Sequence, residues 1–148
     1  MPANATDSQA RHVLLVEDDP GDVLLAKEAF EQSPAPCHLH VAGDGEEAIG
    51  FLRRTGHHEE APRPGLILLD LNLPGRSGLD VLAEIKADGN LATIPVVVLT
   101  TSQDPEDIRR SYQLHTNAYL TKPPGFDRFI EAIRKTGEYF LALIQRPG

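Results

Sequence analysis

Short, unbroken apolar runs alternate along the chain with longer stretches in which apolar residues recur every three or four positions. The runs are rich in β-branched residues, which is typical of strands that are buried on both faces. The longer stretches have the periodicity of helices that are covered on one side. Strands are expected at residues 12–16, 38–41, 66–69, 94–99 and 118–121, and helices at residues 20–30, 46–54, 78–87, 105–114 and 126–144.

This alternation predicts an α/β fold, with five parallel strands joined by right-handed helical crossovers and helices on both faces of the sheet. The 148 residues suffice for one such doubly wound domain. We expect a disordered N-terminus at residues 1–10 and one domain at residues 11–148, which includes a long final helix.

The composition of the chain limits the cellular compartment and the classes of partner that we expect. The single cysteine, Cys37, cannot form a disulfide within the chain, and no apolar stretch resembles a signal peptide or a membrane span. We therefore expect a cytoplasmic protein with no membrane association. The net charge of −8 disfavours binding to nucleic acid.

Functional groups stand where the predicted strands end, and ligands of parallel sheets bind at the carboxyl ends of the strands. Any one of these side chains alone would be an ordinary loop residue, but together they indicate a site. In chain order they are Glu17, Asp18 and Asp19, then Asp70, then Thr100, Thr101 and Ser102, and finally Lys122.

The charges indicate what such a site would hold. Two carboxylates about 5 Å apart repel by roughly 3 kcal/mol at an effective dielectric constant near 20, so a cation is needed. Oxygen ligands favour a hard ion such as Mg²⁺. A carboxylate flanked by a metal, a lysine and a hydroxyl suits phosphoryl transfer, with Asp70 as the nucleophile.

Four motifs carry a resemblance to a known family. They are L-L-V-E-D-D-P (residues 14–20), L-I-L-L-D-L-N-L-P-G-R-S-G (66–78), P-V-V-V-L-T-T-S (95–102) and Y-L-T-K-P (119–123). In this order they resemble the receiver domain of bacterial two-component response regulators. The stretch L-A-E-I-K (82–86) and the extended last helix are most similar to small single-domain regulators that pair with phytochrome histidine kinases.

The resemblance implies a flavodoxin-like receiver fold with strand order 2-1-3-4-5. It also implies a protein that accepts a phosphoryl group from a sensor histidine kinase, such as a phytochrome, and signals in a phosphorelay. Such a protein promotes only its own phosphorylation and dephosphorylation.

The resemblance also assigns roles to residues. Asp70 would be the phosphoacceptor, and Mg²⁺ would be held by Asp18, Asp70 and the carbonyl of Asn72, with Glu17 acting through water. Thr100 and Lys122 would bind the phosphoryl group, and Thr100 and Tyr119 would form the switch pair. A cis peptide bond would precede Pro123, and Asn72 and Ser102 would tune dephosphorylation.

Alternatives remain at this point. A phosphatase of the haloacid dehalogenase type also uses an aspartate, Mg²⁺ and a lysine, but it needs an acid where this chain has Asn72. A flavodoxin-like flavin protein would find three carboxylates where its phosphate should bind. The pair His57 and His58 could bind a metal, but we interpret it as part of a solvated loop because no spaced partner is evident.

The final helix carries two apolar stripes. The first, expected to face the sheet, consists of Phe126, Ile130, Ile133, Phe140 and Ile144. The second lies about 110° away at 3.6 residues per turn and consists of Ala132, Thr136, Tyr139 and Leu143. This second stripe predicts a homodimer, formed through the face that combines the fourth helix, the fifth strand and the fifth helix.

Overall fold

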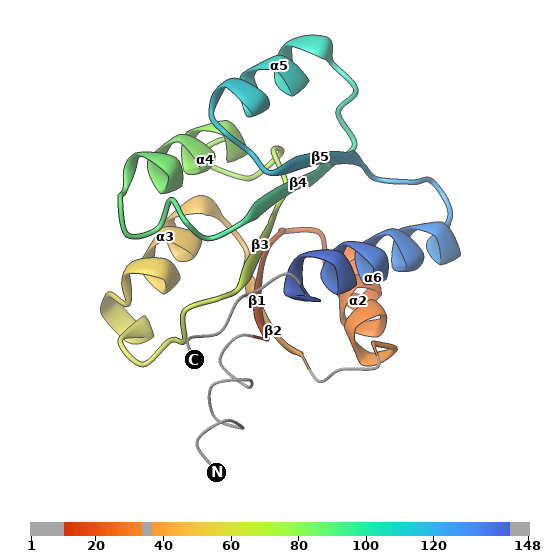
Figure 1. Ribbon diagram of the computed structural model, residues 1–148, viewed down its shortest axis with the longest axis horizontal. Helices are drawn as coiled ribbons and strands as arrows, with labels where there is room; N and C mark the ends of the chain where they lie inside the picture. The colour runs from red at the N-terminus through yellow and green to blue at the C-terminus, as the bar shows by residue number, and fades with distance from the viewer. Residues whose placement is uncertain (1–10, 34–36, 143–148) are drawn as a thin grey trace.

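Five parallel strands form one sheet in the order β2-β1-β3-β4-β5, which confirms the predicted fold class. The computed structural model describes residues 11–33 and 37–142 (Figure 1). The strands are β1 (His12–Val16), β2 (His38–Ala42), β3 (Leu66–Leu69), β4 (Val96–Thr100) and β5 (Ala118–Thr121). The helices are α2 (Pro20–Glu31), α3 (Gly45–Arg53), α4 (Gly78–Ala87), α5 (Pro105–Gln113) and α6 (Phe126–Ala142), with a short 3₁₀ helix η1 (Gly56–His58).

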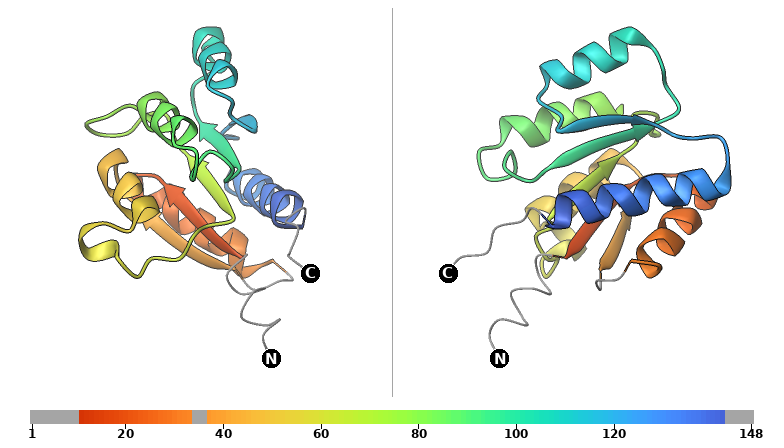
Figure 2. Two further views of the ribbon diagram at one scale, coloured as in Figure 1. Left: turned by 60° about the vertical axis from the view of Figure 1, so that its left-hand side comes forward. Right: turned by 45° about the vertical axis from the view of Figure 1, so that its right-hand side comes forward.

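Helices cover both faces of the sheet (Figure 2). On one face, Leu14 and Val16 pack with α3 and α4, while Val13 and Leu15 of the same strand pack with α2 and α6 on the other face. Successive strand residues point to opposite faces, so a strand covered twice must be apolar at every position. This is why the buried strands appear in the sequence as unbroken apolar runs.

Side-chain caps set where the helices begin. Asp19, Asp44, Ser77 and Asp104 precede α2, α3, α4 and α5, and each accepts a hydrogen bond from a backbone N–H of the first turn. The turn from β1 into α2 is therefore fixed by Asp19, directly beside Glu17 and Asp18.

Both ends of β4 differ from the prediction. β4 begins at Val96 rather than at residue 94, because Pro95 has no N–H for the ladder, although its carbonyl accepts from Ile67. β4 also includes Thr100, which stays buried at the end of the strand.

The predicted faces of α6 are wrong in part. Phe126 is 74% exposed, whereas burial begins with Phe129 and continues through Ile133 to Leu141. Thr136 is buried as well, and its hydroxyl donates to the carbonyl of Ala132, so it does not stand on an open stripe. Periodicity gives the direction of a side chain around the axis but not how far along the axis the helix is covered.

Some predictions lie outside the described residues: the disordered segment 1–10 and the positions of Leu143 and Ile144. Among the residues that the structure describes, no helix combines the length and the apolar character needed to cross a membrane.

Candidate functional site: an acidic cluster closed by a lysine

The ends of β1 and β3 bring three carboxylates together, as predicted. The N–H of Glu17 donates to Ala42, and the N–H of Asp70 donates to Val16, so the sheet ladder fixes both backbones. Glu17 and Asp70 are buried, whereas Asp18 is exposed. One carboxylate oxygen of each lies within 4.8 Å of the others.

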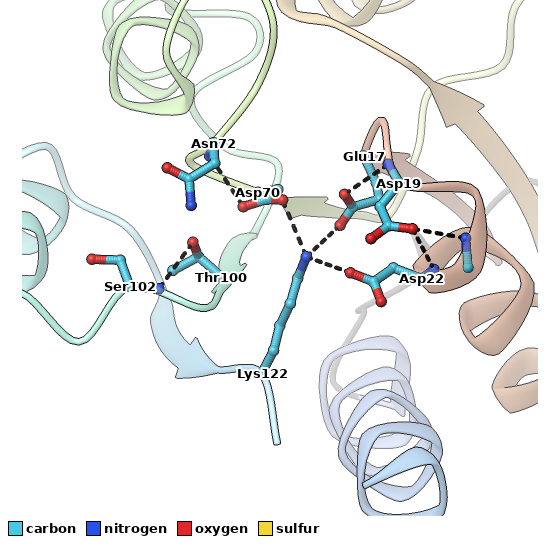
Figure 3. Close-up of polar contacts among 9 residues, drawn as sticks. Glu17, Asp19, Asp22, Asp70, Asn72, Thr100, Ser102 and Lys122 are labelled. Atoms are coloured by element: carbon cyan, nitrogen blue, oxygen red, sulfur yellow. Dashed lines mark hydrogen bonds and ion pairs between the residues drawn. The ribbon is translucent and has the colours of Figure 1, made fainter. Parts of the chain in front are cut away.

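Lys122 reaches this cluster from the end of β5 (Figure 3). Its N–H donates to the carbonyl of Thr100, which fixes the backbone beside β4. Its side chain is 7% exposed, and Nζ lies 2.7 Å from Glu17 Oε1 and 3.1 Å from Asp70 Oδ2. The ammonium group therefore compensates two buried carboxylates at once.

A third carboxylate on Lys122 was missed by the sequence analysis. Asp22 Oδ2, in the first turn of α2, lies 2.7 Å from Lys122 Nζ. Acidic residues are common in the first turn of helices, because their charge interacts favourably with the helix dipole. The sequence therefore offered no reason to assign Asp22 to the site. Its position four residues after Asp18, on a helix that starts at the site, was the available hint.

Burial and charge shift the pKa values in this cluster. Burial, together with the charge of Asp70, raises the pKa of Glu17 to about 7, although the Lys122 hydrogen bond opposes the rise. For Lys122, burial alone would lower the pKa, but hydrogen bonds to Asp22 and Glu17 outweigh it and raise the pKa above its usual value. The lysine therefore stays charged at neutral pH. A further cation bound beside Glu17 would lower the pKa of this carboxyl group.

Both oxygens of Asp70 are held by donors. Oδ2 accepts a hydrogen bond from Nζ of Lys122, and Oδ1 accepts one from the backbone N–H of Asn72 at 3.1 Å. The loop behind Asp70 is pinned by Gly78, whose N–H donates to Leu71. A Cβ on Gly78 would lie 2.3 Å from the carbonyl oxygen of Asp70, so only glycine fits there.

The peptide of Ser102 links Thr100 to Tyr119. The N–H of Ser102 lies 3.4 Å from Thr100 Oγ1, and the hydroxyl of Tyr119 donates to the Ser102 carbonyl at 2.9 Å. The Ser102 hydroxyl itself donates to Asp107 of α5 at 2.7 Å. The two residues predicted as a switch pair are thus joined through one backbone segment, which also holds α5.

The predicted cis bond before Pro123 is wrong. The described residues contain no cis peptide bond, so Lys122 and Pro123 are joined in the trans form. The trans form is the more stable one for most X–Pro bonds, by about 0.5–1 kcal/mol. Lys122 contacts Asp70 from this trans geometry.

The donor set fits a hard divalent cation. Glu17, Asp18 and Asp70 offer only carboxylate oxygens, and their closest oxygens lie near enough together to share an ion. Such ligands suit Mg²⁺ or Mn²⁺ rather than a soft metal. Asp19 does not belong to this group of three; its Oδ1 caps α2 by accepting from the backbone N–H groups of Gly21 and Asp22.

Comparison with known proteins places this geometry in a family context. The model of the response regulator receiver domain matches residues 13–134. Response regulator Rcp1 of Synechocystis sp. is 43% identical over 136 residues, which make up 92% of this chain and 92% of that protein.

Solved structures give the same picture. The phosphorylated cyanobacterial phytochrome response regulator RcpA has a TM-score of 0.88 and 43% identity, over 93% of this chain and 99% of that one. The Mn²⁺-bound form of Rcp1 has a TM-score of 0.86 and 42% identity, over 93% of this chain and 99% of that one. One of these relatives thus carries a phosphoryl group and the other a divalent metal.

Proposed function

The chain belongs to the response regulator receiver domains, and from this premise we propose that it accepts a phosphoryl group on Asp70 from a sensor histidine kinase. The observation that carries the proposal is the Asp70 carboxylate itself. It is buried at the end of β3, within reach of Lys122 Nζ and beside two further carboxylates. The comparisons give no support to a phosphatase of the haloacid dehalogenase type.

In the transfer, an oxygen of Asp70 forms a new O–P bond while the P–N bond to the donor imidazole breaks, and the imidazole leaves. The negative charge on the transferred oxygens needs positive partners that are already in place. Lys122 provides one such charge, and the Thr100 hydroxyl at the neighbouring strand end provides a hydrogen bond. Beyond this transfer and the hydrolysis of the resulting aspartyl phosphate, in which water attacks phosphorus, inorganic phosphate leaves and the Asp70 carboxylate is restored, we assign the protein no catalysis.

The switch is proposed to run through Ser102. A phosphoryl oxygen that takes the Thr100 hydroxyl draws it towards Asp70 and away from the Ser102 N–H. Because the Ser102 carbonyl also accepts from Tyr119, this movement alters the surface around β5 and α5. Ser102 and Asn72 flank the acceptor and are proposed to tune the rate of dephosphorylation.

Glu17, Asp18, Asp70 and the Asn72 carbonyl are proposed to hold Mg²⁺. When bound, the ion supplies positive charge that offsets both the carboxylates and the phosphoryl oxygens. The burial of Glu17 and Asp70 supports this proposal, because both carboxylates share the charge of the single ammonium group of Lys122.

Asp70→Ala tests the function. The variant should fold but take up no phosphoryl group from a small phosphodonor in the presence of Mg²⁺, because no other aspartate among the described residues combines burial with contact to Lys122. Intact-mass spectrometry measures the added phosphoryl group, and Asp127→Ala, at an exposed position of α6, serves as the matched control. Labelling of Asp70→Ala at the wild-type level would refute the assignment.

Mg²⁺ should raise the melting temperature of the wild type, because it binds the native carboxylate cluster and not the unfolded chain. At a concentration of 100 times the dissociation constant, the gain should be about 2.7 kcal/mol. Asp18→Ala should lose most of this gain, while Asp80→Ala, outside the site, should keep it. Differential scanning fluorimetry with and without Mg²⁺ decides the matter, and a wild type that ignores Mg²⁺ contradicts the metal site.

A phytochrome-type kinase is the proposed partner, in the cytoplasm, because the relative RcpA is a cyanobacterial phytochrome response regulator. Titration of the chain with a phosphorylated phytochrome kinase would test this. Transfer no faster than from an unrelated kinase would exclude it.

A homodimer through α5, β5 and α6 is also proposed. β5 is an edge strand, and a groove beside it is lined by Ala118, Leu120, Tyr139 and Phe140. Tyr139 is 61% exposed and Ala132 half-buried, as the interface requires, whereas Thr136 is covered within the protomer.

Sedimentation at about 50 micromolar, a range in which weak contacts are visible, tests the dimer. Tyr139→Asp should give a monomer, while Leu24→Asp, an equally exposed apolar position on α2, should not. A wild type that is monomeric with and without phosphorylation would end the proposal.

A further inference from the structure

A second group of ligand-type side chains lies between α3 and the loop that follows it. Nε2 of His57 lies 3.2 Å from Oε1 of Glu47, and Nε2 of His58 lies 2.8 Å from the same oxygen. The three ligand atoms are all within 4.8 Å of one another. No spaced partner of the two histidines is evident in the sequence; the structure supplies Glu47, ten residues before His57.

The backbone of the loop is held in place. The N–H of His58 donates to Thr55, and the N–H of Ala61 donates to His58, so η1 is closed at both ends. Arg54 and Gly56 have positive φ angles of 58° and 61°, which turn the chain sharply back along α3. The histidines are therefore placed by a defined turn rather than by an extended loop.

Two of the three ligands are also held by packing or capping. The side chain of His58 is only 16% exposed, and its ring stands edge-on to Phe51 with centroids 5.6 Å apart. The backbone N–H of Glu47 donates to Asp44 at the start of α3, which fixes its position in the first turn. His57 is 75% exposed, which leaves one side of the group open to solvent.

The spacing fits a small transition-metal ion. Tetrahedral bonds of about 2.0–2.1 Å place neighbouring ligand atoms about 3.3 Å apart. The observed separations from Glu47 Oε1 are 3.2 and 2.8 Å, close to this value, and the two imidazole nitrogens lie within 4.8 Å of each other. Two imidazoles and one carboxylate, with a fourth position left to water, form a set that Zn²⁺ takes in proteins.

We propose that Glu47, His57 and His58 form a binding site for a divalent transition-metal ion of the Zn²⁺ type. The site shares no residue with the acidic cluster at Asp70, and it differs from it in chemistry. Imidazole nitrogen suits Zn²⁺ and its neighbours in the series, whereas Mg²⁺ takes oxygen ligands. An ion here ties η1 to α3 and so fastens the segment that leads into β3.

Isothermal titration with ZnCl₂ tests the site. Mg²⁺ in large excess is present throughout, and the Asp18→Ala background removes any Zn²⁺ bound at the acidic cluster. One equivalent of Zn²⁺ should bind and raise the melting temperature. Glu47→Gln and His58→Ala should each weaken binding by at least about tenfold, as losses of metal-site contacts commonly do. Glu60→Gln, a carboxylate of the same loop, and His115→Asn, a histidine elsewhere, are the matched controls and should bind as the wild type does.

The proposal would be overturned if no Zn²⁺ bound at about 100 micromolar, far above useful affinities. It would also be overturned if Glu47→Gln and His58→Ala both bound Zn²⁺ as the wild type does. Loss of binding in His40→Gln would overturn it as well, because the ion would then lie at the histidines of β1 and β2. Because His58 is packed, His58→Ala can lose stability for other reasons. The more exposed, isosteric Glu47→Gln then decides the result, with its melting temperature in EDTA as the check on folding.

Discussion

Gly78 tolerates a larger side chain less well than the charged residues of the site tolerate substitution, because it packs against backbone atoms rather than side chains. A Cβ at this position would lie 2.3 Å from the Asp70 carbonyl oxygen and 2.5 Å from Leu71 Cα. Main-chain atoms of a strand end cannot swing aside as a side chain can. Any larger residue must therefore displace the segment that carries Asp70.

Gly78→Ala should lower the free energy of unfolding by about 1–3 kcal/mol, the usual cost of overpacking. It should also slow phosphorylation, since Asp70 moves with its carbonyl. Urea unfolding and the rate of labelling by a small phosphodonor measure the two effects. Gly89→Ala, where a Cβ meets nothing within 4 Å, should change neither. Equal behaviour of the two variants would contradict the argument.

Site residues that terminate strands could be predicted from the sequence, whereas those that reach the site from other elements could not. Asp70 and Lys122 were predicted because a parallel sheet brings strand ends together. Asp22 and the pairing of Glu47 with His57 depend on where a helix lies relative to a loop. Strand periodicity carries no information about that relation.

Among the elements, α6 is fastened to α2 by a close contact at a glycine. A Cβ on Gly137 would lie 2.8 Å from Cε1 of Phe30, whose ring is buried between the two helices. The absence of a side chain at residue 137 lets α2 and α6 approach each other. This contact also explains why the buried face of α6 does not follow its large apolar residues alone.

Gly137→Ala should lower the free energy of unfolding by up to about 2 kcal/mol, as overpacking outweighs the gain of about 1 kcal/mol in helix propensity. Gly50→Ala in α3 is the matched control, because its Cβ would make only ordinary contacts of 3.5 Å with His58 and Thr55. It should raise the same free energy by about 0.5–1 kcal/mol. Denaturant titrations that gave both variants the same sign would refute the packing argument.

The strands were easier to predict than the faces of α6. A strand buried on both sides has to be apolar throughout, so β1 and β3 appear in the sequence with their true bounds. A helix at the edge of a layer is covered over part of its length, and Phe126 shows that an apolar residue in the right direction can still lie beyond the cover.

For the whole molecule, stability should depend on pH through a histidine stack on β1 and β2. The ring of His12 stacks on those of His38 and His40, and His12 Nδ1 lies 2.9 Å from His40 Nε2. Burial, with the neighbouring histidines, lowers the pKa of His12, and burial with His38 lowers that of His40. The folded state therefore favours neutral rings, and one ring must accept the hydrogen bond.

Because these histidines have a lowered pKa in the folded state, their contribution to the free energy of unfolding is complete above the pKa of about 6.5 that histidine has in the unfolded chain. This contribution is lost as the pH falls below that value. Glu17 acts in the opposite direction. Its pKa is raised to about 7 in the folded state, so proton uptake by Glu17 increases the free energy of unfolding as the pH falls from about 7 towards the ordinary pKa of a glutamate. A direct comparison of wild type and His40→Gln cancels the Glu17 contribution.

The free energy of unfolding should therefore fall more steeply in the wild type than in His40→Gln between about pH 7.5 and about pH 5.5, the range in which histidine titrates. Denaturant titrations at several pH values in EDTA measure the difference. His115→Asn, outside the stack, should follow the wild type. Parallel curves for wild type and His40→Gln would contradict the role of the stack.

Lys122 has a further consequence for the molecule as a whole. Its ammonium group is a counter-ion tethered to the chain, held at a high effective concentration beside Glu17 and Asp70. Any free cation drawn to these oxygens must share them with it, and this antagonism is reciprocal. Removing the tethered charge, as in Lys122→Met, should therefore tighten Mg²⁺ binding while it weakens the hold on a phosphoryl group. The affinity of the proposed metal site would then be set by a residue directly after β5, some fifty residues after Asp70.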